Sequence, residues 1–378
     1  MEIIWSSFAL VGAFVWWGIL LMPWRPWSTR EFLDAASPLE QEDLSEITVL
    51  IPARNEATAI ETTLAGLKAQ GCNPNMILVD DQSSDGTAEV ARKTAKGKLR
   101  TILGKPLPPG WNGKLWALEQ GRHLIKTPFT LLIDADIELQ PGILVALRKM
   151  MKQNDLHFVS LVASLRMSSF WEKLLMPAFV YFFKLLYPFR LANSKCSKVA
   201  AAAGACILLE TRLLDEMGGF RVFRTELIDD CALARRVKSK GRRTWIGLTH
   251  SIRSLRAYDD LGTIWNMVAR NAFTQLHYSA LLLILCTAIL VAAFWFPVVG
   301  LAFGSGGTRY LSVVALAGMI VSYLPILRFY RISKWWALSM PMIGTLYLGM
   351  TWTSAIRYWQ GKRSEWKGRT YLREVGSS

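Results

Sequence analysis

The chain has 378 residues, a net charge of +15 and a mean hydropathy of +0.24, which is too apolar for an ordinary soluble domain. The basic excess favours anionic partners. No nucleic-acid-binding motif is present, so we exclude nucleic acid and expect the charge to face acidic lipid. The 5 cysteines never occur as Cys-x-x-Cys, which excludes a zinc site and a disulfide framework and favours a reducing compartment.

Residues 1–24 predict a transmembrane anchor. No charged side chain occurs from Ile3 to Trp24, a run long enough to cross a bilayer. The basic start and small-residue cleavage site of a signal peptide are missing, so we expect the anchor to be retained. Arg25 and Arg30 follow it. The positive-inside rule then places the N-terminus outside and the following domain in the cytoplasm.

A polar linker at 25–46 leads into a segment that alternates strand and helix patterns. Apolar, β-branched runs at 47–52, 76–79 and 99–103 predict strands, and helical spacing at 56–70 and after Gly86 predicts the helices between them. Such alternation is typical of a parallel sheet with crossover helices.

Polar residues follow the first two of these strands. The turn from Pro52 to Glu56 closes the first, and Asp80 and Asp81 close the second. Asp85 is expected to cap the helix that follows. The alternative is that all of these are ordinary polar residues of loops and caps.

Lys114 follows a glycine at the start of a predicted helix. A helix N-terminus attracts phosphate, and the lysine adds a point charge there; the alternative is a solvated lysine. Trp111 and Trp116 flank it, and they can either cover a bound ligand or pack in the core.

Leu131 to Ile133 predicts a buried strand that runs directly into Asp134 and Asp136. In open α/β sheets, ligands bind where strands end. Two neighbouring carboxylates repel each other unless a cation lies between them, and hard oxygen ligands suit Mg²⁺ or Mn²⁺ together with substrate phosphates. The alternative is a turn with two solvated aspartates.

Asp229 and Asp230 open a predicted helix that ends near Lys240, and a last strand is expected at 244–248. Acids in the first turn and bases in the last complement the helix dipole, which is the structural alternative to a catalytic pair. Upstream, residues 170–189 are aromatic and interrupted by lysines and prolines. We expect them to lie on the membrane surface, although a buried helix pair fits as well.

The region 276–356 predicts a C-terminal transmembrane region with three candidate spans. Uncharged stretches run from Asn271 to Arg309, over 310–327 and over 335–356. Three spans after one anchor would place the basic tail, 357–378, outside, against the positive-inside rule. Segment 335–356 contains a proline and two glycines and is therefore the one we suspect of not crossing.

These motifs, in this order, resemble the family 2 glycosyltransferases of the GT-A fold. More narrowly, the chain resembles the membrane-bound bacterial hopanoid-associated glycosyltransferases, relatives of ceramide glucosyltransferase. The resemblance covers roughly residues 45–275. The residues that carry it are Ile51–Glu56, Val79–Thr87, Gly113–Lys114, Asp134–Asp136 and Asp229–Asp230. It implies an α/β catalytic domain at 47–275 with a Rossmann-like mixed sheet, between N- and C-terminal transmembrane helices.

The resemblance also implies a chemistry and a location. The enzyme is expected to be an inverting, metal-dependent hexosyltransferase that moves one sugar from a nucleoside diphosphate sugar, a UDP-sugar first, to a membrane lipid such as a hopanoid. It would be an integral protein of the bacterial inner membrane with a cytoplasmic catalytic domain.

The same resemblance assigns roles to single residues. Asp230 is the expected base, supported by Asp229, and Asp136 with Asp134 is expected to hold Mg²⁺ or Mn²⁺. The expected donor-binding residues are Pro52, Arg54, Glu56, Asp81, Lys114, Asp134 and Arg270.

One stretch departs from the family pattern. Many relatives carry Gln-x-x-Arg-Trp where this chain has Met267 to Asn271, so that only Arg270 is kept. The missing tryptophan argues against a processive polysaccharide synthase. That enzyme, a polyprenyl-phosphate glycosyltransferase and a non-catalytic nucleotide-sugar-binding membrane protein are the alternatives.

Overall fold

The computed structural model describes residues 2–35, 42–71, 74–224, 226, 228–361, 365–366 and 369–370. The chain divides into two compact units. The sheet unit comprises Glu31–Arg166, Leu191–Arg256 and Arg363–Ser378, and the helical unit comprises Met1–Arg30, Met167–Arg190 and Ala257–Lys362. Residues 36–41 of the predicted linker and most of the predicted basic tail lie outside the described residues.

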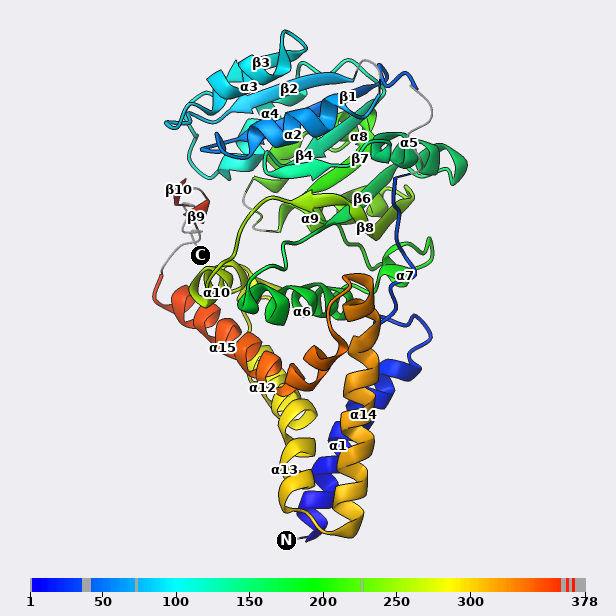
Figure 1. The fold of residues 1–378 in the computed structure, drawn as a ribbon. Coiled ribbons are helices and arrows are strands. Elements are labelled where there is room, and N and C mark those ends of the chain that lie inside the picture. The colour runs from blue at the N-terminus through cyan, green and yellow to red at the C-terminus, as the bar shows by residue number, and fades with distance from the viewer. Residues whose placement is uncertain are drawn as a thin grey trace. The chain divides into compact units, whose positions relative to one another are not determined.

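The sheet unit contains an eight-stranded sheet in the order β3-β2-β1-β4-β7-β6-β8-β5 (Figure 1). β1, β2, β3 and β4 are parallel, β7 is antiparallel to β4 and β6, and β8 is parallel to β6 and antiparallel to β5. The predicted mixed α/β sheet is thus confirmed. The strands are β1 (Ile47–Ala53), β2 (Asn75–Asp80), β3 (Leu99–Leu103), β4 (Phe129–Ile133), β5 (Ile137–Leu139), β6 (Phe158–Ser164), β7 (Cys206–Glu210) and β8 (Thr244–Ser254).

Both faces of the sheet are covered by helices, which explains why its strands are continuously apolar. Val49 and Ile51 of β1 join one buried cluster, whereas Leu50 joins the other, because successive side chains of a strand point to opposite faces. The helices of this unit are α2 (Ile60–Lys68), α3 (Thr87–Ala95), α4 (Gly113–Arg122), α5 (Ile143–Gln153), α8 (Thr211–Glu216) and α9 (Asp229–Ser239).

The parallel strands bring three predicted loops to one edge of the sheet. Ala53 at the end of β1 is in register with Asp80 at the end of β2, and the Asp81 amide donates to the Ala53 carbonyl at 2.8 Å. β4 lies on the other side of β1 and ends at Ile133, next to Asp134. The predicted strand-end carboxylates therefore lie at the same edge.

β8 is longer than the predicted strand at 244–248. After a register shift next to Val162 of β6, its second half pairs with β5, where Ile252 is opposite Leu139. The start of the linker also lies along it, since the Leu33 amide donates to the Leu248 carbonyl at 3.0 Å. The second half of β8 is stabilised by pairing with its neighbours. Its polar residues show no apolar pattern, so the strand could not be predicted there.

The helical unit contains the apolar segments. Two of its described helices, Ala280–Phe303 and Gly306–Phe329, are long and apolar enough to cross a membrane, and α1 contributes a shorter apolar stretch, Ser6–Leu21. The helices are α1 (Glu2–Leu21), α6 (Phe170–Leu186), α10 (Leu261–Ala269), α11 (Ala272–Gln275), α12 (Ala280–Leu290), α13 (Phe296–Phe303), α14 (Gly306–Phe329) and α15 (Met340–Trp359).

The boundary between the units differs from the predicted domain boundary at 275. α6 and α10 belong to the helical unit because they pack on its apolar helices. The Tyr181 hydroxyl of α6 is 2.8 Å from that of Ser322 in α14, and Trp265 Nε1 of α10 donates to Thr353 of α15 at 3.0 Å. Segment 170–189 consists mainly of α6, which is buried at Leu174–Ala178, and its predicted place at the membrane surface stays a prediction.

Candidate active site

The loops after β1 and β2 are joined by hydrogen bonds. Asn55 has a positive φ of 52°, a conformation that asparagine tolerates better than most residues. Its amide donates to Ser83 Oγ at 3.0 Å, and its side-chain oxygen accepts from the Ser84 amide at 2.9 Å. The Glu56 amide donates to Thr87 Oγ1 at 2.9 Å. These contacts hold the two loops as one polar surface at the edge of the sheet.

Arg54 and Asp81, two of the predicted donor-binding residues, lie together in this surface. Asp81 is fully buried, and Arg54 Nη1 lies 3.9 Å from its Oδ2 atom. The same guanidinium donates to the Asp81 and Gln82 carbonyls, so it also orders the backbone of the β2 loop. The Asp81 carboxyl group thus lies beside a cation, and its oxygens can accept hydrogen bonds from a ligand.

Asp85 joins the loops, whereas Gly86 is the N-cap residue of α3, with a φ of 84°. Asp85 accepts from the Ala57 amide at 2.9 Å and from the Thr87 amide at 3.0 Å. Burial alone would raise the pKa of Asp85, but its hydrogen bonds outweigh burial and lower it. The predicted cap is therefore displaced by one residue, because only glycine takes this left-handed conformation easily.

Lys114 lies in the first turn of α4, as predicted. The N-cap residue is Asn112, whose side chain accepts from the Lys114 amide at 2.9 Å. This amide is therefore already satisfied within the helix end. The side chain reaches from α4 to the end of β4, where Nζ lies 2.6 Å from Asp134 Oδ1.

The two flanking tryptophans have structural contacts. Their rings meet edge to face with centroids 5.1 Å apart. Trp116 Nε1 donates to the Lys105 carbonyl at 3.0 Å, and Trp111 packs partly buried against the core. Of the two predicted roles, these contacts support packing.

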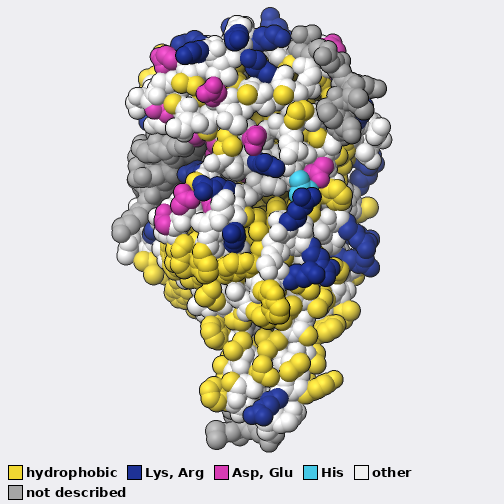
Figure 2. Space-filling model, in the orientation of Figure 1, with side chains coloured by type: hydrophobic (Ala, Val, Ile, Leu, Met, Phe, Trp, Pro, Cys, Tyr) yellow, Lys and Arg dark blue, Asp and Glu magenta, His cyan; other side chains and the backbone are white. Residues whose placement is uncertain are grey.

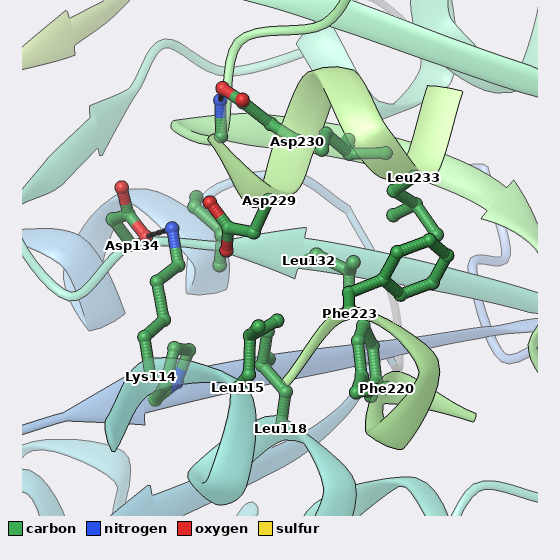
Figure 3. Close-up of a pocket in the computed structure, with 14 residues that line it drawn as sticks. Lys114, Leu115, Leu118, Leu132, Asp134, Phe220, Phe223, Asp229, Asp230 and Leu233 are labelled. Carbon is green, nitrogen blue, oxygen red and sulfur yellow. Dashed lines mark hydrogen bonds and ion pairs between the residues drawn. The ribbon is translucent and has the colours of Figure 1, made fainter. Parts of the chain in front are cut away.

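Figure 3 shows that the Lys114 side chain points toward the carboxylates of Asp134 and Asp229. Burial alone would lower the pKa of Lys114, but Asp134, then Asp229 and finally Asp230 outweigh it and raise that pKa. The ammonium group is therefore charged at any working pH. The structure brings together a base from α4, an acid from the β4 end and two acids from α9.

Asp230 is the acid whose protonation is most perturbed. Burial, followed by the neighbouring Asp229 charge, raises its pKa to about 7. The amides of Cys231 and Gly204, both at 2.7 Å, and the charge of Lys114 oppose this rise. A carboxylate that titrates near neutrality can accept a proton and release it again under ordinary conditions.

Asp134 and Asp136 lie in different surroundings. Asp134 lines the cavity beside Lys114, whereas the Asp136 carbonyl accepts from the Leu255 amide at 2.8 Å at the end of β8. Within the described ranges, no group of three or more acidic, histidine or cysteine side chains is close enough to hold a metal. The carboxylate oxygens of Asp134 and Asp136 still suit Mg²⁺ or Mn²⁺, because such ions are commonly held by one or two carboxylates together with substrate phosphates.

A cavity of about 20 Å³ lies beside the acids, and it is large enough for one water molecule. A nucleotide is much larger than this cavity. The lining includes Pro52, Lys114, Asp134, Asp229 and Asp230, together with apolar side chains such as Phe220 and Phe223.

Two features of this site were missed in the sequence. Gly204, whose amide donates to Asp230, lies close to the Lys114 ammonium group, since an added Cβ would lie 3.1 Å from Lys114 Nζ. The run of alanines around it is the signal that could have indicated this close approach. Glu119 of α4 accepts from the Phe220 amide at 2.7 Å and so positions the wall of the cavity.

Arg270, the remaining predicted donor-binding residue, belongs to the helical unit, where it ends α10. The sheet unit contains the others: Pro52 near the end of β1, Arg54 and Glu56 after it, Asp81 after β2, Lys114 and Asp134 as an ion pair, and Asp229 with Asp230 on α9.

Comparison with known proteins shows similarity over the part of the chain that contains these residues. A family model described as "Glycosyltransferase like family 2" matches residues 45–274. A 4,4'-diaponeurosporenoate glycosyltransferase of Staphylococcus haemolyticus is 31% identical over 120 residues, 32% of each chain. An undecaprenyl-phosphate 4-deoxy-4-formamido-L-arabinose transferase of Edwardsiella ictaluri is 29% identical over 99 residues, 25% of this chain and 30% of that protein. The matches thus span about a third of these curated relatives.

A solved structure extends the likeness of the fold over most of the chain. A mannosyltransferase from Pyrobaculum calidifontis, in complex with GDP-Man and Mn²⁺, aligns with a TM-score of 0.57 and 20% identity. The alignment covers 95% of this chain and 100% of that one. At this identity the likeness concerns the fold.

Substitution of Lys114 tests its electrostatic interaction with Asp134, Asp229 and Asp230. In Lys114→Met, three carboxylates lose their counter-charge, and we expect a loss of about 1–3 kcal/mol in the free energy of unfolding. The loss should be larger at pH 8 than at pH 5, because Asp230, with a pKa of about 7, is protonated at the lower pH and no longer repels Asp229. Thermal unfolding at both pH values measures it.

The exposed Lys126→Met is the matched control, and it should change little at either pH. An equal loss for Lys114→Met at pH 5 and pH 8 would contradict the proposed charge cluster.

Proposed function

Because the chain belongs to glycosyltransferase-like family 2 and is therefore a glycosyltransferase, we propose that it is an inverting enzyme that moves a single sugar from a nucleoside diphosphate sugar to a membrane lipid. The observation that carries the proposal is the carboxylate of Asp230 beside Lys114, Asp229 and the end of β4. Its pKa of about 7 suits a general base at neutral pH.

In the proposed reaction, Asp230 takes the proton of an acceptor hydroxyl. The hydroxyl oxygen forms a new bond to the anomeric carbon as the bond from that carbon to the diphosphate breaks. One displacement of this kind inverts the configuration, in contrast to retaining hydrolases, which use a second carboxylate as nucleophile. Asp229 supports the base, since its charge helps to raise the pKa of Asp230.

The donor is proposed to lie along the loops after β1 and β2. Pro52, Arg54 and Glu56 line the nucleotide, and Asp81 accepts a hydrogen bond from its base. We propose UDP-sugars as the donors. A comparison of turnover with UDP-sugars and with GDP-sugars tests which nucleobase the enzyme prefers. Lys114 is proposed to exchange its contact with Asp134 for the donor diphosphate, which carries more negative charge; Arg270 is proposed to contact the same group.

Asp136 with Asp134 is proposed to hold Mg²⁺ or Mn²⁺ together with the donor diphosphate. Such an ion supplies neutralisation of the charge that develops on the departing nucleoside diphosphate. The chemistry of the two carboxylates supports this choice. So does the Mn²⁺ in the complex of the Pyrobaculum mannosyltransferase, which has a similar fold.

The acceptor is proposed to be a lipid in the membrane. The apolar helices of the helical unit support this, as does a relative named for undecaprenyl phosphate, a lipid phosphate. A hopanoid is the acceptor suggested by the family resemblance, and a polyprenyl phosphate is the alternative suggested by that relative. α6 is proposed to help admit the lipid.

We propose that α1 and the helices at 280–303 and 306–329 cross the bacterial inner membrane and that α15 does not. Among the described helices, α15 is neither a candidate span nor a shorter apolar stretch, whereas α1 contributes the apolar stretch Ser6–Leu21. With three crossings, an outside N-terminus leaves both the sheet unit and the basic tail in the cytoplasm. This count removes the conflict with the positive-inside rule that a fourth span would create.

The role of Asp230 is tested by Asp230→Asn, which keeps the shape of the side chain and removes its basicity. Single-turnover transfer should fall about 10²–10⁴-fold while donor affinity changes little. In the unaltered enzyme, transfer should decline as the pH falls below about 7, because the carboxylate then binds a proton.

Asp229→Asn is the comparison for this test. It should cost less, and it should move the acidic limb of the pH profile to lower pH, since it removes a charge that raises the pKa of Asp230. Normal transfer by Asp230→Asn, or a loss of donor binding instead of transfer, would assign the base to another residue.

Dependence on a divalent ion is tested by chelation and by Asp136→Asn. Release of nucleoside diphosphate should fall by about 10²-fold or more in both cases, since such an ion contributes several kcal/mol to the transition state. Glu138→Gln, which changes a half-buried acid two residues away in β5, is the control and should remain active. Full turnover in chelator would remove the metal from the mechanism.

The orientation is tested with an impermeant thiol reagent on intact cells. In a Cys196→Ser background, Ser45→Cys should label only after permeabilisation, and Gly306→Cys, between the two proposed C-terminal spans, should label without it. Both side-chain positions are exposed. The opposite labelling pattern would reverse the proposed topology.

A further inference from the structure

One end of the helical unit carries basic side chains for which the proposed transfer has no use. α1 and α14 pack side by side and run in the same direction. Ser6 Oγ is 2.7 Å from Thr308 Oγ1, and eleven residues later Trp17 Nε1 donates to the Val314 carbonyl at 2.9 Å. The C-terminal ends of both helices therefore lie at the same end of the unit (Figure 1).

Basic side chains cluster at this end, and we call them the basic belt. All are exposed, and none forms an ion pair with any residue that the structure describes. The Arg190 guanidinium donates to the Pro23 carbonyl at 2.8 Å, which places it beside the segment after α1. The belt consists of Arg25, Arg30, Arg190, Arg328, Arg331 and Lys334.

The acidic residues of the helical unit do not neutralise the belt. The helical unit has four acidic residues. Glu172 is buried and accepts a hydrogen bond from the Tyr258 amide. Asp259 and Asp260 precede α10, and Glu2 lies at the opposite end of α1. A helix C-terminus attracts bases only within its last turn. That effect accounts for Arg328, but not for a cluster of this size.

The belt borders an exposed apolar surface. Leu21 at the end of α1 is 75% exposed, and Trp335, next to Lys334, is 78% exposed. Figure 2 shows a broad hydrophobic surface of this unit that gives way to a group of Lys and Arg side chains. Tryptophan and basic residues beside an apolar band are typical of the headgroup level of a membrane.

We propose that the basic belt binds the phosphate headgroups of anionic phospholipids at the cytoplasmic surface of the membrane. The inference rests on the membrane placement proposed above. Charge complementarity and the adjoining apolar surface both favour this partner, because a phospholipid offers a headgroup to the belt and chains to the apolar helices. Each basic side chain near an anionic surface strengthens the association with anionic lipid by about fivefold at most.

The test measures lipid association directly, so it does not depend on catalysis. The protein is reconstituted in phosphatidylcholine vesicles with a trace of spin-labelled phosphatidylglycerol or spin-labelled phosphatidylcholine, and electron paramagnetic resonance gives the motionally restricted fraction of each. The unaltered protein should prefer phosphatidylglycerol several-fold, and about 1 M salt should reduce this preference, because the Debye length then shortens to about 3 Å.

The variant combines Arg328→Gln, Arg331→Gln and Lys334→Gln, and it should lose most of the preference. Arg309→Gln, an exposed arginine at the other end of α14, is the matched control and should retain it. An unchanged preference in the triple variant, or an equal loss in Arg309→Gln, would overturn the proposal. Displacement of the lipid by millimolar inorganic phosphate would also overturn it, because the belt would then be a site for small anions.

A carbonate wash at high pH separates this inference from the membrane placement. If the protein leaves the vesicles during the wash, the proposed spans fail, and the inference that depends on them fails too. If it stays and shows no lipid preference, only the basic belt is misassigned.

Discussion

The ammonium group of Lys114 is the contact on which the polar site of the sheet unit depends. It reaches from α4 to Asp134, 2.6 Å away at the end of β4, and it opposes the charges of Asp229 and Asp230 at the start of α9. Without this ammonium group, the three neighbouring carboxylates would repel one another. One lysine thus ties three elements together and keeps the pKa of Asp230 from rising further, near the value that a general base needs at neutral pH.

The order of the strands explains why these residues meet. β1, β2 and β4 are parallel neighbours, so the loops that follow them lie at one edge, where α/β proteins bind their ligands. β7 then runs antiparallel to β4, so its start is at the same edge. Gly204, two residues before β7, can therefore donate its amide to Asp230. The switch from parallel to antiparallel pairing brings the second half of the chain to the site.

The helical unit combines two physical requirements. Its apolar helices suit a bilayer, whereas α6 and α10 are held by hydrogen bonds between side chains, such as those of Tyr181 and Trp265. The proposed transfer to a lipid needs both an apolar surface and ordered polar contacts near it. The exposed bases at the ends of α1 and α14 add a third element, because they lie where an apolar surface meets water.

The sequence by itself determined the strands β1 to β4, the helices between them, the strand-end carboxylates and the apolar helices, because each of these depends on a local pattern of apolar and polar residues. It also placed Lys114 at a helix start and the acid pair on α9. Only the tertiary structure decided which of these residues touch: the pairing of Lys114 with Asp134 and the hydrogen bond from the Gly204 amide to Asp230. The second half of β8 and the place of α6 were decided in the same way. Such contacts join segments far apart in the chain, and burial and partner charge set the pKa of Asp230, so no local pattern contains them.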